Sequence, residues 1–307
     1  YELVDSNGIV PIRLSEKEYV RAHDFRRYLH KNLEDFIIET PLENPLDFLN
    51  KQFDASLIKD VQTKWIPYDF KNQNIDDFLE NLDIDKTVEI SSIQGGYSNA
   101  IKQLNKFIEV GYQDYAKYRS DPSKEASSQL SPYFHSGQIS THEVFDKISE
   151  LESWSPESIN PKMVGRREGW WGSTENFESF MDELITWREL GYHTCVRRAN
   201  YNQYSSLPEW AIKTLHEHSS DEREHIYSLD ELTYSQTHDE IWNAAQNQLR
   251  TQGVIQNYLR MLWGKKILEW TPNPQIALSY MITLNDRYSL DGRDPNSYSG
   301  VFWILGR

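Results

Sequence analysis

Apolar residues at helical spacing dominate this chain, and strand-like alternation is nearly absent after residue 20. Apolar positions that recur every three or four residues form one face of a helix, whereas a half-buried strand needs a period of two. We therefore expect a mainly α fold with long irregular connections. The predicted helices span residues 16–40, 100–118, 140–152, 175–193, 208–217, 229–233, 238–270 with a break near Gly253, and 274–287.

The first third of the chain has a weaker pattern. Residues 1–12 alternate apolar and polar positions, which predicts an extended or turning segment. Ser15 is a candidate N-cap for the helix over residues 16–40. Residues 51–95 are acidic and weakly patterned, as is typical of short helices and a linker. We expect two parts: an entry segment and linker with short helices over residues 1–98, and a helical domain over residues 99–307.

The charge of the chain argues against a protein that binds nucleic acid over a large surface. The formal net charge is −15 at pH 7, whereas phosphate contacts require Lys and Arg. A DNA-binding face would have to be a local basic patch on an acidic body. Three clusters are candidates, unless they are ordinary solvated charges: Lys162 with Arg166 and Arg167, Arg197 with Arg198, and Lys265 with Lys266.

Cysteine content and hydropathy indicate which cellular compartment suits the chain. The single cysteine, Cys195, excludes an internal disulfide framework and a cysteine-based zinc site, and no metal is expected. This composition suits a cytoplasmic protein. No run of 18 apolar residues occurs, so no transmembrane helix is expected. The chain begins at Tyr1 without an initiator Met or a signal-peptide pattern, and we expect it to be part of a longer protein.

Hydroxyl groups cluster in the segment that precedes residue 140. Ser127 and Ser128 come shortly before the pair Ser131-Pro132. Hydroxyls and backbone N–H groups at the start of a helix can bind an anion, aided by the helix dipole. A Ser-Pro start is also commonly a simple helix cap. The residues alone therefore leave both interpretations open.

A carboxylate and an indole are expected to lie together in the segment 180–190. Glu183 and Trp187 are four positions apart and would share one face of a helix. Such a carboxylate can hydrogen-bond the edge of a base while the ring packs against the base. Alternatively, Trp187 is a core residue and Glu189 pairs with a neighbour. Upstream, Trp170-Trp171 follows two arginines and could grip DNA, although a packed turn is the favoured interpretation.

Three tryptophans recur near the end of the chain. Trp263 and Trp270 are seven residues apart, which is about 10.5 Å or two turns along one helix face. Trp242 lies on the preceding helical segment. Indoles at this spacing can pass an electron, whereas isolated buried tryptophans are normally core residues. The periodicity alone does not decide between these interpretations.

Together these segments resemble the flavin-binding domain of class II cyclobutane pyrimidine dimer photolyases, within the photolyase/cryptochrome family. The resemblance covers roughly residues 1–12 and 100–307. It implies a mainly α fold, the helical FAD-binding domain of the photolyase/cryptochrome type. The family's N-terminal α/β antenna domain, which would hold any antenna pigment, is absent from this chain. The runs that carry the resemblance are Leu-Ser-Pro-Tyr (130–133), the segment 180–190, Asn-Tyr-Leu-Arg-Met-Leu-Trp (257–263), Leu-Asp-Gly-Arg-Asp-Pro-Asn (290–296) and Gly-Val-Phe-Trp (300–303).

The activity that the resemblance implies is light-driven DNA repair. Photoexcited reduced FAD would give an electron to a cyclobutane pyrimidine dimer flipped out of UV-damaged DNA, and the dimer would split. The protein would act as a monomer and would not bind membranes. The alternative is a cryptochrome-like flavin photoreceptor without repair activity, which stays open because Ile255-Gln256 stands where the family usually has Met-His. A helical nucleic-acid scaffold that has lost flavin is a third hypothesis.

The resemblance also implies a role for particular residues of this chain. Arg260 and Asp291 are expected to form a salt bridge that faces the isoalloxazine ring, with Asn285 beside flavin N5. The residues expected at the lesion are Glu183, Trp187, Asn257, Met261 and Trp303. The residues expected at the flavin are Tyr115, Arg119, Ser127, Ser128, Leu130, Ser131, Phe180, Arg188, Asn257, Arg260, Asn285, Asp291 and Asp294. The tryptophans expected to relay electrons to the flavin are Trp242, Trp263 and Trp270.

Overall fold

The regular structure of the chain is helical, as the spacing of its apolar residues predicts. The computed structural model describes residues 5, 7–38, 40–42, 44, 47, 55–66, 69 and 74–306. No strand occurs among these residues, and the mainly α fold class is confirmed. Residues 1–4 and 6 of the expected extended segment lie outside the described residues. The chain divides into two compact units, Tyr1–Thr40 with Val88–Arg307, and Pro41–Thr87.

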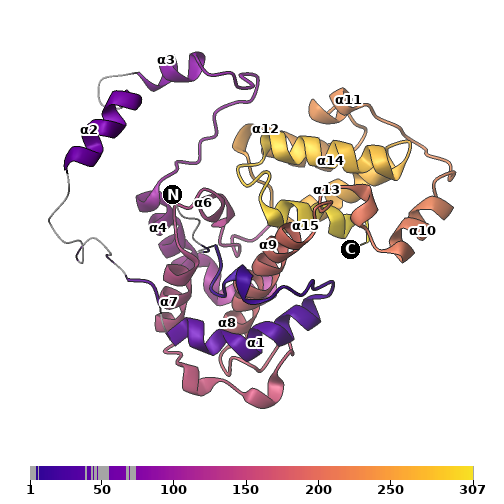
Figure 1. Ribbon diagram of the computed structural model, residues 1–307. Coiled ribbons are helices and arrows are strands. Elements are labelled where there is room, and N and C mark those ends of the chain that lie inside the picture. Colours follow the sequence, from indigo (N-terminus) through magenta and orange to yellow (C-terminus); the bar gives the residue numbers. More distant parts are fainter. Residues whose placement is uncertain are drawn as a thin grey trace. The chain divides into compact units, whose positions relative to one another are not determined.

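The described residues of the smaller unit form two short helices, in agreement with the weak pattern of its sequence. They are α2 (Ala55–Lys64) and α3 (Ile75–Glu80) (Figure 1). Asn74 begins α3 as its N-cap, because its side chain accepts a hydrogen bond from the backbone N–H of Asp76 at 2.9 Å. A division of the whole chain after residue 98 stays a prediction.

The first half of the larger unit packs its helices around one hydrophobic cluster. The helices are α1 (Ala22–Ile38), α4 (Tyr97–Lys106), α5 (Tyr115–Tyr118), α6 (Ser131–His135), α7 (Thr141–Leu151), α8 (Glu175–Met181) and α9 (Arg188–Arg197). Two π-helical segments, Phe107–Gly111 and Asp182–Trp187, interrupt otherwise α-helical runs. This first cluster includes Leu29, Leu104, Tyr112, Ile148 and Phe177, all of which are buried.

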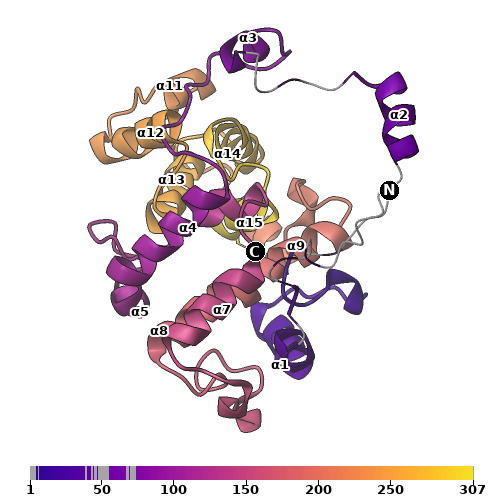
Figure 2. The ribbon, with the colours of Figure 1, turned by 90° about the vertical axis from the view of Figure 1, so that its left-hand side faces the viewer.

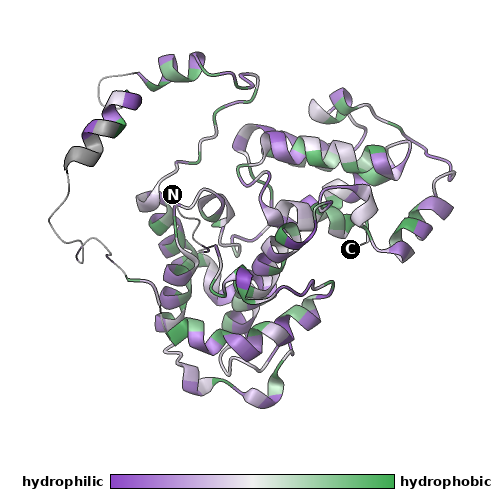
Figure 3. Ribbon diagram, in the orientation of Figure 1, coloured by the Kyte–Doolittle hydropathy of each residue, from purple (hydrophilic) through white to green (hydrophobic). Residues whose placement is uncertain are grey.

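The second half of the larger unit has a hydrophobic cluster of its own. Its helices are α10 (Glu209–Glu217), α11 (Leu229–Thr233), α12 (Glu240–Gln252), α13 (Asn257–Glu269), α14 (Pro274–Tyr288) and α15 (Pro295–Ile304). Gly264 allows α13 to approach its neighbours closely, since a Cβ there would lie 2.2 Å from Cδ1 of Ile304 and 3.0 Å from Sδ of Met281. Figure 3 shows apolar and polar residues interspersed along these helices, as expected for amphipathic elements.

Most helices lie where the sequence pattern predicts them, with two differences. The predicted break near Gly253 is confirmed: this glycine ends α12 with φ 76°, and its carbonyl accepts a hydrogen bond from the backbone N–H of Leu290 at 2.8 Å. The helix predicted over residues 16–40 begins only at Ala22. The helix α15 was not predicted, although Asp294 and Pro295 are typical N-cap and N1 residues.

Ser15 is not the N-cap of α1, contrary to expectation. Its backbone carbonyl accepts hydrogen bonds from Nη2 of Arg197 at 2.8 Å and lies 3.2 Å from Nε2 of His193. Its hydroxyl lies 3.1 Å from the Tyr19 hydroxyl. The backbone at Ser15 is extended, and these tertiary partners on α9 compete with helix formation.

The turn that carries Trp170 and Trp171 is packed, so the hypothesis that these rings grip DNA is wrong. Trp170 is 1% exposed and Trp171 is 4% exposed. Trp170 stacks on the ring of His30 with a centroid distance of 3.9 Å. In the part of the chain that the structure describes, no helix has both the length and the apolar character needed to cross a bilayer.

Candidate functional site

The residues expected at the flavin come from both halves of the larger unit, and several of them meet along a polar seam. We call the region where the two halves of the larger unit meet the seam. It is defined by Arg119, Ser131, Arg260, Asp291 and Asp294. On its flank, α9 lies beside α15 (Figure 2). Polar side chains with tertiary partners are needed here because unpaired polar groups are costly to bury.

Arg260 and Asp291 form the ion pair that was expected, and this prediction of pairing is confirmed. Nη1 and Nη2 of Arg260 both lie 3.2 Å from Oδ1 of Asp291. Nη1 also lies 3.4 Å from Oδ1 of the buried Asn285. The Asp291 carboxylate accepts further hydrogen bonds from the hydroxyls of Ser289 and Ser131. The pair is thereby tied to the first half of the unit through Ser131.

The Asp291 carboxyl stays ionised in this setting. Burial acts to raise its pKa, but Arg260 and the hydroxyls of Ser289 and Ser131 outweigh burial and lower the pKa below its ordinary range. A fixed guanidinium, a carboxylate and the amide of Asn285 therefore share one small region. This donor and acceptor set suits a ring that gains negative charge on reduction.

Asp294 is held by the protein itself. Its Oδ2 accepts a hydrogen bond from the Tyr192 hydroxyl at 2.9 Å and lies 3.2 Å from Nδ1 of His135. Its Oδ1 accepts from the backbone N–H of Asn296 at 2.8 Å and so caps α15. Burial and the Asp294 charge raise the pKa of Tyr192 to about 12. A flavin contact at Asp294, which stays a prediction, would have to share an oxygen that is already engaged.

Arg119 pairs with Glu183, which brings an expected flavin residue to an expected lesion residue. Nη1 of Arg119 lies 2.8 Å from Oε1 of Glu183, and the side chain of Arg119 also hydrogen-bonds the buried Tyr115. Burial raises the pKa of Glu183 despite the opposing effect of Arg119. Glu183 lies in a π-helical segment rather than in the α-helix that was expected. Whether Arg119 reaches a phosphate stays a prediction.

The other residues expected at the lesion border α13 and α15. The rings of Trp187 and Trp303 meet edge to face with a centroid distance of 5.4 Å. Trp303 is 55% exposed, and it is therefore accessible to a ligand from solvent. A Cβ at Gly300 would lie 3.6 Å from Cε of Met261. Asn257 is the exposed first residue of α13.

Phe180 and Arg188, which were both expected at the flavin, pack against other residues of the protein. Phe180 is 3% exposed, and its ring contacts those of Phe107 and Tyr115, each at a centroid distance of 5.2 Å. Arg188 donates a hydrogen bond to the carbonyl of Asn7, and its guanidinium covers the ring of Tyr192 at 4.8 Å. Their direct contact with a flavin stays a prediction.

The serine-rich turn lies next to the ion pair only through Ser131. Ser127 and Ser128 are half-buried, and the backbone carbonyl of Ser128 accepts a hydrogen bond from Gln103 at 2.9 Å. Leu130 is fully buried in the first cluster. The helix α6 that follows has five residues, so the dipole that was expected to help bind an anion is small.

The three tryptophans of the expected relay are buried and in contact. The rings of Trp242 and Trp263 are parallel, with a centroid distance of 6.5 Å and an interplanar angle of 1°. The ring of Trp270 meets that of Trp242 at 5.6 Å. The indole N–H of Trp242 donates to the carbonyl of Trp263 at 3.0 Å, and that of Trp263 donates to Gln246 at 2.8 Å. The order of contact is therefore Trp263, Trp242, Trp270.

The arginines of one expected basic patch have structural partners. Nη2 of Arg197 donates to the carbonyl of Ser15 at 2.8 Å. Arg198 donates to the carbonyl of Ser206 at 2.7 Å and pairs with Glu18. These contacts give both arginines a structural role, and a DNA-facing role for the pair stays a prediction. The exposed residues of the remaining clusters are Lys162, Arg166, Arg167 and Lys265.

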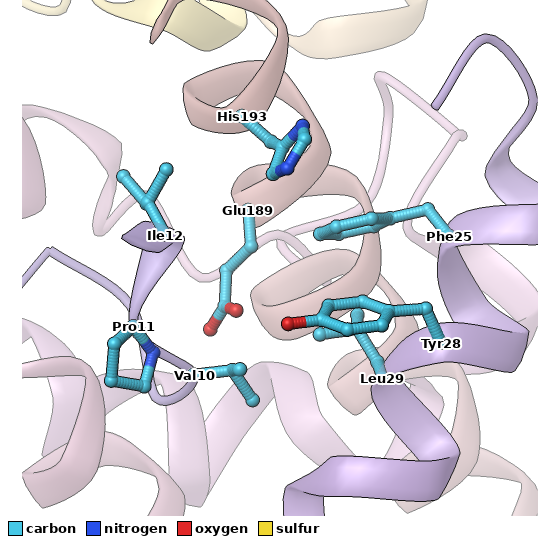
Figure 4. A pocket seen from close by; sticks show the side chains of 8 residues that line it. All are labelled: Val10, Pro11, Ile12, Phe25, Tyr28, Leu29, Glu189 and His193. Atoms are coloured by element: carbon cyan, nitrogen blue, oxygen red, sulfur yellow. The ribbon is translucent and has the colours of Figure 1, made fainter. Parts of the chain in front are cut away.

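A small pocket contains the buried carboxyl of Glu189, for which the sequence suggested pairing with a neighbour. Figure 4 shows Glu189 between Val10 and Tyr28 in this pocket. Glu189 is 3% exposed, and its Oε1 accepts a hydrogen bond from the backbone N–H of Ile9 at 2.6 Å. Burial raises its pKa to about 8, against the opposing effect of the backbone N–H groups of Ile9 and Val10. This residue anchors the start of the chain to α9.

Glu189→Gln is expected to make the free energy of unfolding less dependent on pH. Between about pH 4.5 and pH 8 the native carboxyl is protonated while the unfolded one is ionised, so the free energy of unfolding falls as pH rises through this range. Glutamine keeps the acceptor for Ile9 without the charge, and the variant should be about 1–3 kcal/mol more stable at pH 8.5. Urea unfolding of the wild type and the variant at pH 5 and pH 8.5 measures this difference, and the exposed Glu150→Gln is the control. The prediction would be contradicted if the free energy of unfolding changed with pH equally in the wild type and in Glu189→Gln.

Curated relatives match the chain over almost its whole length. It is 34% identical over 305 residues to a deoxyribodipyrimidine photo-lyase of Methanothermobacter thermautotrophicus, a match that covers 99% of this chain and 60% of that protein. It is 34% identical over 306 residues to a deoxyribodipyrimidine photo-lyase of Potorous tridactylus, covering 98% of this chain and 51% of that protein. The chain thus spans about half to three fifths of the length of these relatives. No protein-family model matches it.

A solved structure has a similar fold. A bacterial class III photolyase from Agrobacterium tumefaciens superposes with a TM-score of 0.61 over 98% of this chain and 54% of that chain, at 19% sequence identity. At this level of identity the likeness concerns the fold alone. The match covers both hydrophobic clusters and the seam between them.

Proposed function

We propose that the chain belongs to the photolyase/cryptochrome family and is the FAD-binding part of a class II photolyase, which its similarity to curated photo-lyases and its fold support. Such an enzyme splits cyclobutane pyrimidine dimers in UV-damaged DNA with light. The observation that carries the proposal is the Arg260–Asp291 ion pair with Asn285 beside it. Buried charges of this kind are retained when they satisfy one another and serve a site.

In this proposal the flavin lies along the seam. Reduced FAD would supply the electron that splits the dimer, and the protein would supply geometry and electrostatics. Arg260 would face the isoalloxazine ring, with Asp291 holding the guanidinium in place and Asn285 presenting its amide. Ser131 is well placed to contribute as well, since its hydroxyl already reaches Asp291. The donor set fits a flavin, and Tyr115, Arg119, Ser127, Ser128 and Asp294 are the further residues proposed to contact it.

The lesion would enter beside Trp303. Trp303 is more than half exposed and its ring meets that of Trp187 edge to face, so the two indoles can wall a flipped pyrimidine dimer. Glu183 and Asn257 would hydrogen-bond the pyrimidine edges. Flipping the dimer out of the duplex costs a few kcal/mol, less than for an intact pair because a damaged pair is already poorly stacked.

Illumination of the reduced full-length protein with a dimer-containing oligonucleotide tests this proposal. We expect dimers to disappear in the light and to persist in the dark. Persistence of the dimers under light in protein that contains reduced FAD would exclude repair. Absence of dimer-specific DNA binding in the dark would instead favour the cryptochrome-like photoreceptor, which the Ile255-Gln256 departure leaves open.

A further inference from the structure

Gln256 joins the two sides of the seam through both ends of its side-chain amide. Its Oε1 accepts hydrogen bonds from the backbone N–H groups of Tyr258 at 2.6 Å and Leu259 at 3.2 Å, which caps α13. Its Nε2 donates to the backbone carbonyl of Arg119 at 2.8 Å. Gln256 and Arg119 are 137 positions apart in the sequence, so this contact is a tertiary link.

The link connects residues that the proposed function places at the lesion and at the flavin. On one side, the guanidinium of Arg119 holds Glu183 at 2.8 Å. On the other side, the backbone carbonyl of Gln256 accepts from the N–H of Arg260 at 2.9 Å, and Asn257 is the next residue. Gln256 therefore links Arg119, which holds Glu183, to the first turn of α13.

An amide suits this link because it presents donors and an acceptor at the same time. Its NH₂ group donates and its carbonyl oxygen accepts, and neither ability changes with pH. An imidazole can do both only while it is neutral, since both ring nitrogens become donors on protonation. With glutamine at position 256, the cap of α13 and the bond to Arg119 persist together.

We propose that Gln256 is a positioning residue for dimer binding. By holding Arg119 against α13, it keeps Glu183 and Asn257 at the separation that a pyrimidine dimer requires. The inference rests on the proposed function and deepens it. Gln256 need not touch the dimer, because it acts through Arg119 and through the first turn of its own helix.

The variant Gln256→Ser separates the link from the cap. Serine is a good N-cap residue, so α13 still begins normally, but its short side chain cannot reach the carbonyl of Arg119. The matched control is Asn273→Ser, which replaces the amide that caps α14 by accepting from the N–H of Ile276 at 2.9 Å. Both variants exchange an amide cap for serine, and only one removes a bond to Arg119.

Two measurements on the full-length protein test the inference. Without DNA, hydrogen exchange of the backbone amides in residues 115–119 should accelerate about fivefold to tenfold in Gln256→Ser and stay unchanged in Asn273→Ser. In the dark, the dissociation constant for a dimer-containing oligonucleotide should rise about fivefold to tenfold in Gln256→Ser alone. Repair per absorbed photon at saturating DNA and the thermal midpoint should match the Asn273→Ser control.

Each contrary outcome overturns a different statement. Unchanged hydrogen exchange in Gln256→Ser would show that the link does not stabilise residues 115–119, and the inference fails. Faster exchange with unchanged dimer affinity would reject the positioning role and leave the proposed function standing. An unaltered protein that binds dimer-containing and undamaged DNA equally would overturn the proposed function, and the inference with it, before any variant is compared.

Discussion

Replacing Asp182 with alanine is expected to lower the free energy of unfolding by about 3–5 kcal/mol, the largest stability effect at any single residue considered. Nε and Nη2 of Arg26 donate to the two carboxylate oxygens of Asp182 at 2.7 and 3.0 Å. The two side chains are only 9% and 4% exposed. The substitution would leave the Arg26 guanidinium buried without its carboxylate, which is far costlier than losing a surface pair.

Urea unfolding of the wild type and the variant measures this effect. The exposed pair Lys213–Glu217 offers a matched control, and Glu217→Ala should change the free energy of unfolding by less than about 0.5 kcal/mol. The double variant Arg26→Met with Asp182→Leu should recover most of the loss, because apolar side chains of similar volume need no partner. A loss below 1 kcal/mol in Asp182→Ala, roughly that of an exposed ion pair, would show that this ion pair is dispensable.

Replacing Trp242 with phenylalanine is expected to slow the light-driven reduction of bound flavin about a hundredfold, a barrier increase of roughly 2.7 kcal/mol. The ring of Trp242 contacts those of both other tryptophans, with centroid distances of 6.5 Å to Trp263 and 5.6 Å to Trp270. Phenylalanine fills most of the same space but is much harder to oxidise than an indole. The path from Trp270 to Trp263 would therefore be interrupted at its centre. This prediction rests on the proposed flavin site.

The control for this substitution is Trp154→Phe in the first cluster. The indole N–H of Trp154 donates to the carbonyl of Trp171 at 2.7 Å, just as that of Trp242 donates to the carbonyl of Trp263 at 3.0 Å. Both variants therefore lose one indole hydrogen bond to a tryptophan backbone. Absorbance of the flavin under continuous light, with an external electron donor, reports its reduction. Equal slowing in the two variants would argue against a relay through Trp242.

Periodicity predicted most of the helices, and its failures have identifiable causes. The break at Gly253 was predictable because glycine favours the left-handed conformation that ends a helix. The helix α15 has the sequence Pro-Asn-Ser-Tyr-Ser-Gly-Val-Phe-Trp-Ile, whose polar first half hides any apolar face. Its N-terminal signal, Asp294-Pro295, was present and carried more information than the apolar spacing. The late start of α1 was not predictable, because the competing partners of Ser15 are on α9.

Only some of the contacts within the candidate site could be predicted from the sequence. The pairing of Arg260 with Asp291 followed from the resemblance and is confirmed. The partners of Asp294 were out of reach of local reasoning, since Tyr192 lies 102 and His135 lies 159 positions away in the sequence. The pairing of Arg119 with Glu183 was missed for a similar reason. Glu183 lies in a π-helical segment, and π-helical turns are rare interruptions for which apolar spacing gives no signal.

The hydrogen bond between the Gly253 carbonyl and the N–H of Leu290 has a mechanical consequence. It joins the turn at Gly253, between α12 and α13, to Leu290, which directly precedes Asp291. A Cβ at position 253 would lie 2.6 Å from Cγ of Leu290, so a side chain there would displace that loop. In the proposed flavin site, a substitution at this uncharged glycine would thus shift Asp291 relative to Arg260 and change the absorption and reduction potential of the bound flavin.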